Sequence, residues 1–407
     1  MTPRRAVSTA HGALRHVLLW CPLDIKGLRG YRAAYAELFR TLPATVRLTV
    51  IVHPKTADLV DELLATAGRE ATTTVLATGH DRRFTVWAQD PCLVLEGEDG
   101  TPTLLTPPRF DREQDIDVVE LLAAAGGVGV QRSPLCFQGG DVLVGDDFAL
   151  VGRSSVNDTL DHLEQGDGEL RDTDVTDRFE QTLGCKVVVV DTGGALPEGR
   201  MRTISVKGRD VLEILPGGWQ NPHPLGHLDM FVTLAGRGPS GRYRLLVGSP
   251  VLADELLGRS PLDDALPAQF DDVAAQLADE GFEVHRNPMP LTYGDGRRKV
   301  DDRLRDVRVW YYATANNCLL QIDPVEGDRV WLPTYGHEAW RELAATDAAN
   351  RRLWENLGFA VCELGSFHAF AQRFGALHCI AKELERRQHV SAPATEDATA
   401  LPVRALR

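Results

Sequence analysis

Residues 226–234 have the sequence Gly-His-Leu-Asp-Met-Phe-Val-Thr-Leu, in which His227 and Asp229 interrupt a run of apolar and β-branched residues. Such a run is typical of a buried β-strand, and side chains alternate between the two faces of a strand. His227 and Asp229 are therefore predicted to point the same way. Because an unpaired ionisable group is costly to bury, we interpret this pair as part of a functional site.

Two other strand-like segments carry ionisable side chains. Residues 84–90 have the sequence Phe-Thr-Val-Trp-Ala-Gln-Asp, and residues 375–381 have the sequence Gly-Ala-Leu-His-Cys-Ile-Ala. Cys379 becomes a nucleophile only with a lowered pKa or an adjacent base, and a free cysteine is more commonly a small buried apolar residue. In a strand His378 would point away from Cys379, so His227 is the better candidate for the base.

Asp90 and Asp229 are two carboxylates without a lysine or arginine beside them in the sequence. Taken alone, each carboxylate is explained as well by a structural role, as a turn cap or half of an ion pair, as by a role in a functional site. Two carboxylates near a cysteine and a histidine instead match a guanidinium, a planar cation that carboxylates bind with paired hydrogen bonds. Trp87 would lay its ring against that cation, although a single tryptophan in a strand more commonly belongs to the core.

A fourth segment, residues 137–144, has the sequence Phe-Gln-Gly-Gly-Asp-Val-Leu-Val. The glycine pair permits a close backbone approach or a positive φ at the start of a strand. Asp141 is either a ligand group or a turn residue, and we favour a place in the site. The turn-rich segment 216–226 precedes His227 and is typical of a loop that lines an active site.

The composition of the chain limits the classes of binding partner and the cellular location to be expected. The chain has 407 residues and a formal net charge of −14, which argues against nucleic acid or an anionic membrane as a partner and suits a cationic small molecule. Seven scattered cysteines without a Cys-x-x-Cys pair indicate a reducing, cytoplasmic location. We expect no cofactor and no metal site. Nucleotide-binding glycine motifs are absent from the sequence. The one His-x-x-x-His spacing, His223 and His227, contains Pro224 and Gly226, which disfavour the helix that would align the two ligands.

Strand-like and helix-like segments alternate, which predicts an α/β fold built from small modules. We expect one catalytic domain over residues 1–387 and a disordered tail over 388–407. Strands are expected at 15–21, 46–52, 84–95, 148–152, 186–190, 202–206, 228–235, 243–248, 318–322, 329–333 and 377–381, and helices at 55–69, 117–125, 174–183, 267–280, 338–357 and 368–373.

Four motifs in order, Trp-x-x-Asp, Gly-Gly-Asp, His-x-Asp and a late His-Cys, span residues 84–381. This order resembles the guanidino-group-modifying enzymes of the pentein superfamily, which include arginine, agmatine and peptidylarginine deiminases, amidinotransferases and dimethylarginine hydrolases. The resemblance implies a five-bladed, pseudo-symmetric ββαβ propeller. It further implies that Cys379 attacks the guanidinium carbon, that His227 transfers protons, and that Asp90 and Asp229 bind the guanidinium nitrogens.

Within this superfamily the motifs resemble those of peptidylarginine deiminases most. Trp87-Ala88-Gln89-Asp90 is similar to their Trp-x-Gln-Asp, and Arg132 falls where they have an arginine that contacts the substrate backbone. Gln138 stands where enzymes of free arginine and agmatine have a third guanidinium ligand, a glutamate, and this lowers the expectation for those substrates. Residues 91–93, Pro-Cys-Leu, lack the acidic side chains through which the vertebrate enzymes bind calcium.

The leading hypothesis from the sequence is a hydrolase that converts a guanidino group to a ureido group. Its expected substrate is an arginine residue in a peptide or protein. Its substrate-binding set is Asp90, Asp229, Trp87, Arg132, Gln138 and Asp141. An amidinotransferase, a deiminase of free arginine or agmatine, and a binding module without turnover are the alternatives. The sequence leaves the oligomeric state open, with a homodimer as one expectation.

Overall fold

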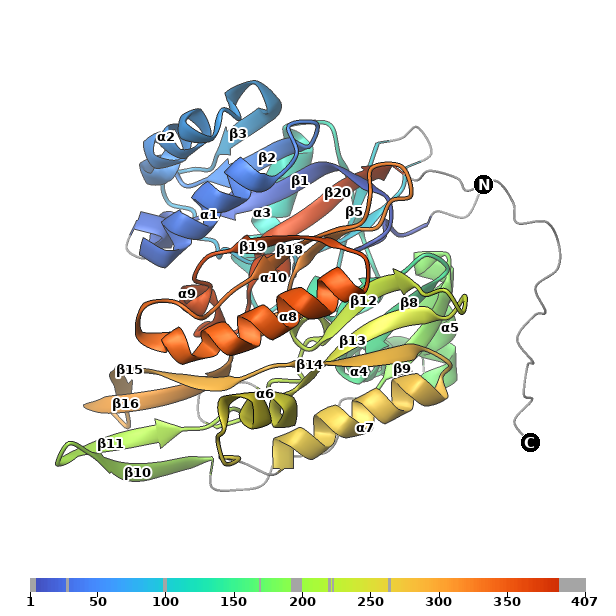
Figure 1. Cartoon of the computed structure of the whole chain (residues 1–407). Helices are drawn as coiled ribbons and strands as arrows, with labels where there is room; N and C mark the ends of the chain where they lie inside the picture. Colours follow the sequence, from blue (N-terminus) through green and yellow to red (C-terminus); the bar gives the residue numbers. More distant parts are fainter. Residues whose placement is uncertain are drawn as a thin grey trace.

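Figure 1 shows the computed structural model, which describes residues 5–387 except 27–28, 98–100, 168–169, 192–199, 219–220, 222 and 263–264. The tail expected over residues 388–407 lies outside the described residues. None of the described helices has the length and apolar character of a membrane span.

Five sheets repeat one topology, in which two antiparallel strands are followed by a helical connection and a strand parallel to the second. The first sheet joins β4 (Leu93–Leu95), β5 (Thr103–Thr106) and β6 (Gly129–Arg132), with α3 (Glu113–Ala124) in the connection. The second joins β7 (Val142–Val144), β8 (Phe148–Gly152) and β9 (Lys186–Val190), with α4 (Arg153–Asp167) and α5 (Asp172–Leu183).

The remaining three sheets follow the same rule. One joins β12 (Val232–Arg237), β13 (Tyr243–Ser249) and β14 (Glu283–Pro288), with α6 (Pro250–Leu257) and α7 (Ala265–Asp279). Another joins β17 (Leu319–Gln321), β18 (Arg329–Pro333) and β19 (Ala360–Leu364), with α8 (Ala344–Asn356). The last pairs β20 (Ala381–Arg387) with β1 (Ala13–Cys21), followed by α1 (Arg29–Thr41), β2 (Arg47–Val52), α2 (Ala57–Ala67) and β3 (Thr73–Ala77).

A further four-stranded sheet stands apart from this repeat. It contains β10 (Met201–Val206), β11 (Arg209–Ile214), β16 (Arg303–Tyr312) and β15 (Leu291–Val300), in that order. Figure 1 shows it at the end of the molecule opposite α2 and β3. The expected mixed α/β fold is confirmed, whereas the described strands pair within six separate sheets and the five-bladed propeller stays a prediction.

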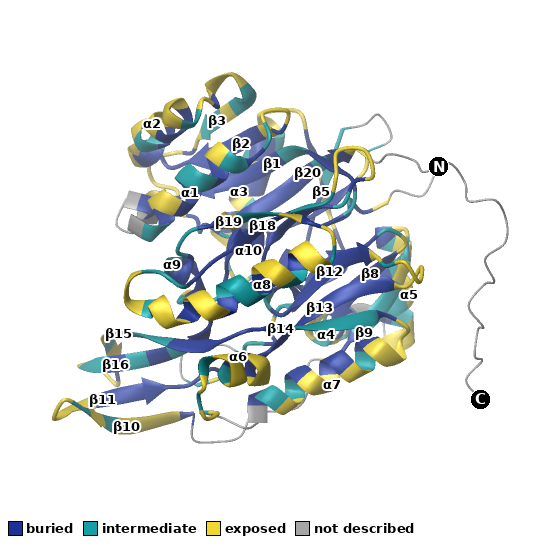
Figure 2. Cartoon of the chain, viewed as in Figure 1, coloured by how far each residue is buried: buried dark blue, intermediate teal, exposed yellow. Residues whose placement is uncertain are grey.

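Most strands are buried, and longer helices such as α7 and α8 cover them with one face exposed (Figure 2). The largest apolar cluster gathers β1, β2, α1 and the short helices α9 (His368–Ala371) and α10 (Leu377–Ile380). Tyr31 stacks on Phe370 in this cluster, with 4.1 Å between the ring centroids. This packing holds α10, which carries Cys379, against the first strands of the chain.

Three predicted strand segments are wrong at the residues that matter for function. Residues 84–92 form turns, residues 228–230 form the 3₁₀ helix η5 (Leu228–Met230), and residues 377–380 form α10. In these segments the backbone and the polar side chains form hydrogen bonds outside any sheet, with partners both near and distant in the sequence. The Thr85 amide and hydroxyl donate to Asp115, and the Met230 amide donates to the His227 carbonyl at 3.2 Å.

Candidate active site

Cys379 lies buried on α10, within reach of side chains from two other segments. Its Sγ lies 3.4 Å from Oδ2 of Asp229 on η5. The Asn317 amide donates to the same sulfur at 3.0 Å, and its oxygen accepts from the amides of Ala376 and Cys379. Asn317 thus holds the α10 backbone and the thiol together. Sequence reasoning missed this residue, which precedes Cys318 and β17 without a motif of its own.

His378 lies beside Asp229, although in a strand its side chain would point away from Cys379. Because residues 377–380 are helical, the adjacent side chains of His378 and Cys379 are not sent to opposite faces of a sheet. The His378 Nδ1 lies 2.8 Å from Asp229 Oδ2, and both side chains are buried. The strand predicted over residues 377–381, which made His378 the poorer candidate for the base, is therefore wrong at His378 and Cys379. The same-face argument for His227 and Asp229 does not apply to a 3₁₀ turn.

Asp90 has a cationic partner that its neighbours in the sequence do not reveal. Arg112, the residue before α3, donates from Nη2 to Asp90 Oδ2 at 2.6 Å and from Nε to buried Asp115 at 2.9 Å. His227 approaches the other Asp90 oxygen, with 3.9 Å between Nδ1 and Oδ1. Asp90 is thus held on one side by a guanidinium of the chain and faces His227 on the other.

Two carboxylate oxygens beside the thiol lack a donor. Asp90 Oδ1 and Asp229 Oδ1 are buried and accept no hydrogen bond from the described part of the chain. Buried acceptors without partners are rare in native proteins and call for an explanation. A ligand that brings two or more N–H donors and a positive charge would satisfy both oxygens.

Burial and the two carboxylates both affect the charge state of the Cys379 thiol. Burial raises the pKa of the Cys379 thiol well above its usual value, Asp229 and Asp90 raise it further, and the Asn317 amide opposes them. The thiol is therefore protonated when no cation is bound. A cation between the carboxylates would favour the thiolate.

The glycine pair serves close packing at this site. A Cβ on Gly139 would lie 2.0 Å from the Gln89 carbonyl oxygen, and the Gln89 side chain donates back to the Gly139 carbonyl at 3.2 Å. The same turn carries Asp141, which accepts from Ser154 at 2.8 Å and Ser155 at 2.6 Å at the start of α4. Burial raises the pKa of Asp141 to about 6, and nearby His227 opposes that rise.

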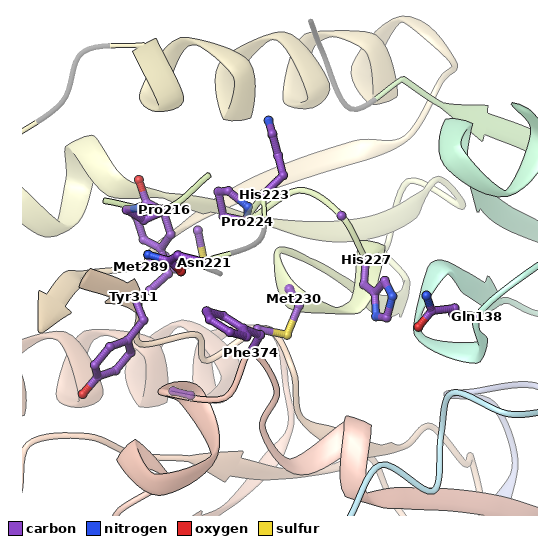
Figure 3. Close-up of a pocket in the computed structure, with 13 residues that line it drawn as sticks. Gln138, Pro216, Asn221, His223, Pro224, His227, Met230, Met289, Tyr311 and Phe374 are labelled. Carbon is purple, nitrogen blue, oxygen red and sulfur yellow. The ribbon is translucent and has the colours of Figure 1, made fainter. Parts of the chain in front are cut away.

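Two cavities meet at Gln138, Gly226 and His227. The first, the apolar cavity, has a volume of about 280 Å³ and is lined by Gln138, Pro216, Asn221, His223, Pro224, Gly226, His227, Met230, Met289, Tyr311, Tyr312, Ala371 and Phe374. Figure 3 shows Met230 between Phe374 and His227. The second, the acidic cavity, has a volume of about 350 Å³ and includes Arg109, Asp111, Asp141, Asp158 and Asp161. Five residues of the turn-rich segment 216–226 line the apolar cavity: Pro216, Asn221, His223, Pro224 and Gly226. The place of this segment in an active site stays a prediction.

Trp87 and Arg132 lie outside the lining of both cavities. The Trp87 ring packs over Gly375, where a Cβ would lie 2.2 Å from the indole, and meets Phe370 at 6.4 Å between centroids. The Arg132 guanidinium is exposed and donates to the Pro108 carbonyl at 2.6 Å. Their substrate contacts stay predictions, and the surroundings of Trp87 suit the core interpretation. Among the described residues, no group of three or more His, Cys, Asp or Glu could hold a metal ion.

Comparison with known proteins places the fold. No protein-family model and no curated protein matches the sequence. A solved structure of a putative agmatine deiminase is 15% identical, has a TM-score of 0.63, and aligns over 94% of this chain and 96% of its own. An agmatine deiminase of C. jejuni is 13% identical, has a TM-score of 0.59, and aligns over 95% and 97%. The chain therefore shares its fold with these two structures.

Proposed function

We propose that this chain is a cysteine-dependent deiminase that hydrolyses a guanidino group to a ureido group and ammonia. The observation that carries the proposal is the pair of buried oxygens, Asp90 Oδ1 and Asp229 Oδ1, that lack a donor beside the Cys379 sulfur. A guanidinium offers the planar donors and the charge that such a pair requires. The shared fold with agmatine deiminases supports the same class of reaction.

The first half of the proposed reaction is attack by sulfur. The bound guanidinium favours ionisation of Cys379, whose proton passes to His227. The thiolate adds to the guanidinium carbon, and His227 donates the proton to the departing ammonia. The product is a cationic amidino thioether, an S-alkylthiouronium, held between Asp90 and Asp229. Its charge remains compensated by the same carboxylates.

The second half is hydrolysis. His227 takes a proton from water, and the hydroxide adds to the thiouronium carbon. Collapse of this adduct breaks the carbon–sulfur bond, and the sulfur takes the proton from His227 to give back the thiol. The hydroxyl proton of the adduct is released as the ureido carbonyl forms, and the departed ammonia takes it up as ammonium. One guanidinium and one water are consumed, and one ureido product and one ammonium are formed. His378 and Asn317 orient Asp229 and Cys379 throughout.

The proposed substrate is an arginine residue in a peptide, with agmatine as the second candidate. The motifs Trp87-Ala88-Gln89-Asp90 and Gly226-His227-Leu228-Asp229 favour the first, as does Gln138 in place of a glutamate. The names of the two solved structures favour the second. If an amine instead of water takes the amidino group, the chain is an amidinotransferase with the same nucleophile.

The test is release of ureido product and ammonia from a blocked arginine amide, agmatine and free arginine, each with and without an added amine acceptor and calcium. We expect ureido product without calcium, and none from Cys379→Ala. Cys362→Ser, which changes a half-buried cysteine on β19, is the control and should retain turnover. Turnover by Cys379→Ala at the wild-type rate would overturn the mechanism, and a new guanidine on the amine would favour the transferase.

A further inference from the structure

The apolar cavity has a lining without permanently charged side chains. Met289, Tyr312 and Phe374 form part of its wall, and the Tyr311 hydroxyl is bonded to His368 at 2.6 Å. Burial lowers the pKa of His223, so this histidine is neutral at pH 7. The sequence from 214 to 228 contains no Asp, Glu, Lys or Arg. Six of its described residues line the cavity: Pro216, Asn221, His223, Pro224, Gly226 and His227.

This cavity adjoins the nucleophile through Met230. The Met230 sulfur lies 4.0 Å from the Cys379 sulfur and within 3.6 Å of the Asn317 amide nitrogen. The Cys379 sulfur lies within 4.0 Å of polar or sulfur side-chain atoms of Asp229, Asn317 and Met230, and of these three residues Met230 lines the apolar cavity. The apolar cavity therefore reaches the thiol through Met230.

Phe374 is held in an unfavourable backbone conformation at the cavity wall. Its φ is +66°, which is rare for a bulky side chain. Such conformations concentrate at ligand-binding sites, where the surrounding structure enforces them. The turn Arg373–Phe374–Gly375 therefore places an aromatic ring at the cavity at a conformational cost.

We infer that the substrate's guanidino chain ends in a neutral, apolar group that occupies this cavity, as in an N-acylated guanidinoalkylamine or a blocked arginine. The inference rests on the proposed function and names its substrate class. An ammonium or carboxylate would be desolvated in this lining without a side chain of permanent opposite charge, which is unfavourable. An aromatic or aliphatic acyl group instead replaces water against Met289, Tyr312 and Phe374.

The acidic cavity, which His227 also lines, would favour the opposite kind of substrate tail. Asp111, Asp158 and Asp161 there would stabilise an ammonium, and Asp158 already has a pKa raised by burial and by Asp161. A substrate whose tail entered that cavity would be preferred with a free amine. The two directions thus make opposite predictions for one matched pair of compounds, agmatine and N-benzoylagmatine.

The experiment compares kcat/KM for agmatine, N-acetylagmatine, N-benzoylagmatine and free arginine. Acetylation removes the charge, and the benzoyl group adds an apolar ring to the same chain. We expect kcat/KM to rise in the order agmatine, acetyl, benzoyl, with benzoyl above agmatine by at least about tenfold, the scale of a filled apolar pocket. Equal or better use of agmatine would overturn the inference while leaving the proposed function in place. Absence of product from all four, with no chloroacetamidine adduct on Cys379, would overturn both.

Two variants of Phe374 test the cavity itself. Aspartate and asparagine tolerate positive φ, so Phe374→Asp and Phe374→Asn differ in charge and share the loss of the ring. Both should lower kcat/KM for N-benzoylagmatine by about tenfold, and only Phe374→Asp should raise it for agmatine. Leu304→Ala, on an exposed apolar residue of β16 outside both cavities, is the control and should change neither value. Unchanged use of N-benzoylagmatine by both Phe374 variants would contradict the assignment.

Discussion

At the residue scale, the site is built around a thiol that resists ionisation. Cys379 is buried, lies 3.4 Å from a carboxylate oxygen, and receives one amide donor from Asn317. Two negative charges and burial outweigh that donor, so the pKa of the thiol stays high until a cation arrives. We expect this arrangement to slow the reaction of the cysteine with neutral reagents relative to cationic ones.

The reactivity of Cys379 should therefore depend on the charge of the reagent. We expect cationic chloroacetamidine to add one equivalent to Cys379 at pH 7. Neutral iodoacetamide should react slowly at Cys379, with a rate that rises about tenfold per pH unit as the thiolate fraction grows. Peptide mapping by mass spectrometry over pH 6–9 measures both rates. Equal rates for the two reagents at pH 7 would contradict the raised pKa, and Cys379→Ser should give no adduct at this position.

The titration of Asp141 makes the unfolding free energy of the protein depend on pH. Burial raises its pKa in the folded chain to about 6, above the ordinary value of 3.8, so the folded state holds the proton more tightly. Stability is therefore greatest, for this group, below pH 4 and falls as the pH rises through 6.

The variant Asp141→Asn removes this titration and can still bond to Ser154 or Ser155. Relative to this variant, the wild-type chain should lose on the order of 3 kcal/mol of unfolding free energy between pH 4 and pH 7. Urea denaturation at pH 4, 5, 6 and 7 measures the difference. A difference that stays flat over this range would show that Asp141 is not buried as a proton-binding group.

At the element scale, α3 is joined to the site by Arg112. This residue links Asp115 in the first turn of α3 to Asp90 in the turn that precedes β4. Asp115 is fully buried and also accepts from the amide and hydroxyl of Thr85. The short turn from 84 to 92 thus takes its shape from a helix more than twenty residues later.

Removal of the Arg112 side chain should leave two buried carboxylates without their cation. We expect Arg112→Ala to lower the unfolding free energy by about 3 kcal/mol and to raise KM because Asp90 loses its orientation. Arg82→Ala is the matched control, since Arg82 also contacts α3 but pairs with exposed Asp117 at 3.7 Å. The control should change stability by less than about 1 kcal/mol. Equal effects of the two substitutions in urea denaturation would contradict the role of Arg112.

At the scale of the whole molecule, the last described strand completes the sheet that contains β1. β20 pairs antiparallel with β1, and Cys379 lies two residues before β20. Arg386 of β20 donates to the carbonyls of Thr9, Ala10 and Gly12 and to Glu383, all in the interior. The position of the nucleophile thus depends on contacts between the two ends of the described chain.

We expect Arg386→Ala to destabilise the protein by about 3–5 kcal/mol, because it leaves buried Glu383 and three carbonyls without their donor. Arg386→Lys, which keeps the charge, should be less destabilising. Arg387→Ala removes the neighbouring, exposed partner of Glu326 and should cost less than about 1 kcal/mol. Thermal and urea denaturation of the three variants compare these values. A stability of Arg386→Ala equal to that of Arg387→Ala would contradict this account.

The sequence alone predicted much of the architecture and the kinds of residue at the site. Apolar periodicity placed strands such as β2, β8 and β13 to within one or two residues, because each has a continuous buried run. The same reasoning failed at 84–92, 227–231 and 377–380. There the apolar residues are buried by turns and short helices whose hydrogen bonds depend on distant partners.

The sequence alone identified the candidate reacting groups: a cysteine, histidines and carboxylates in apolar segments where their burial demands an explanation. Only the tertiary structure decided how these groups are paired. Arg112 with Asp90, Asn317 with Cys379, and His378 with Asp229 join residues 22, 62 and 149 positions apart. The physical reason is that local propensity reports on neighbours in the chain, whereas charge compensation and hydrogen bonding in a low-dielectric interior depend on which segments the folded core brings together.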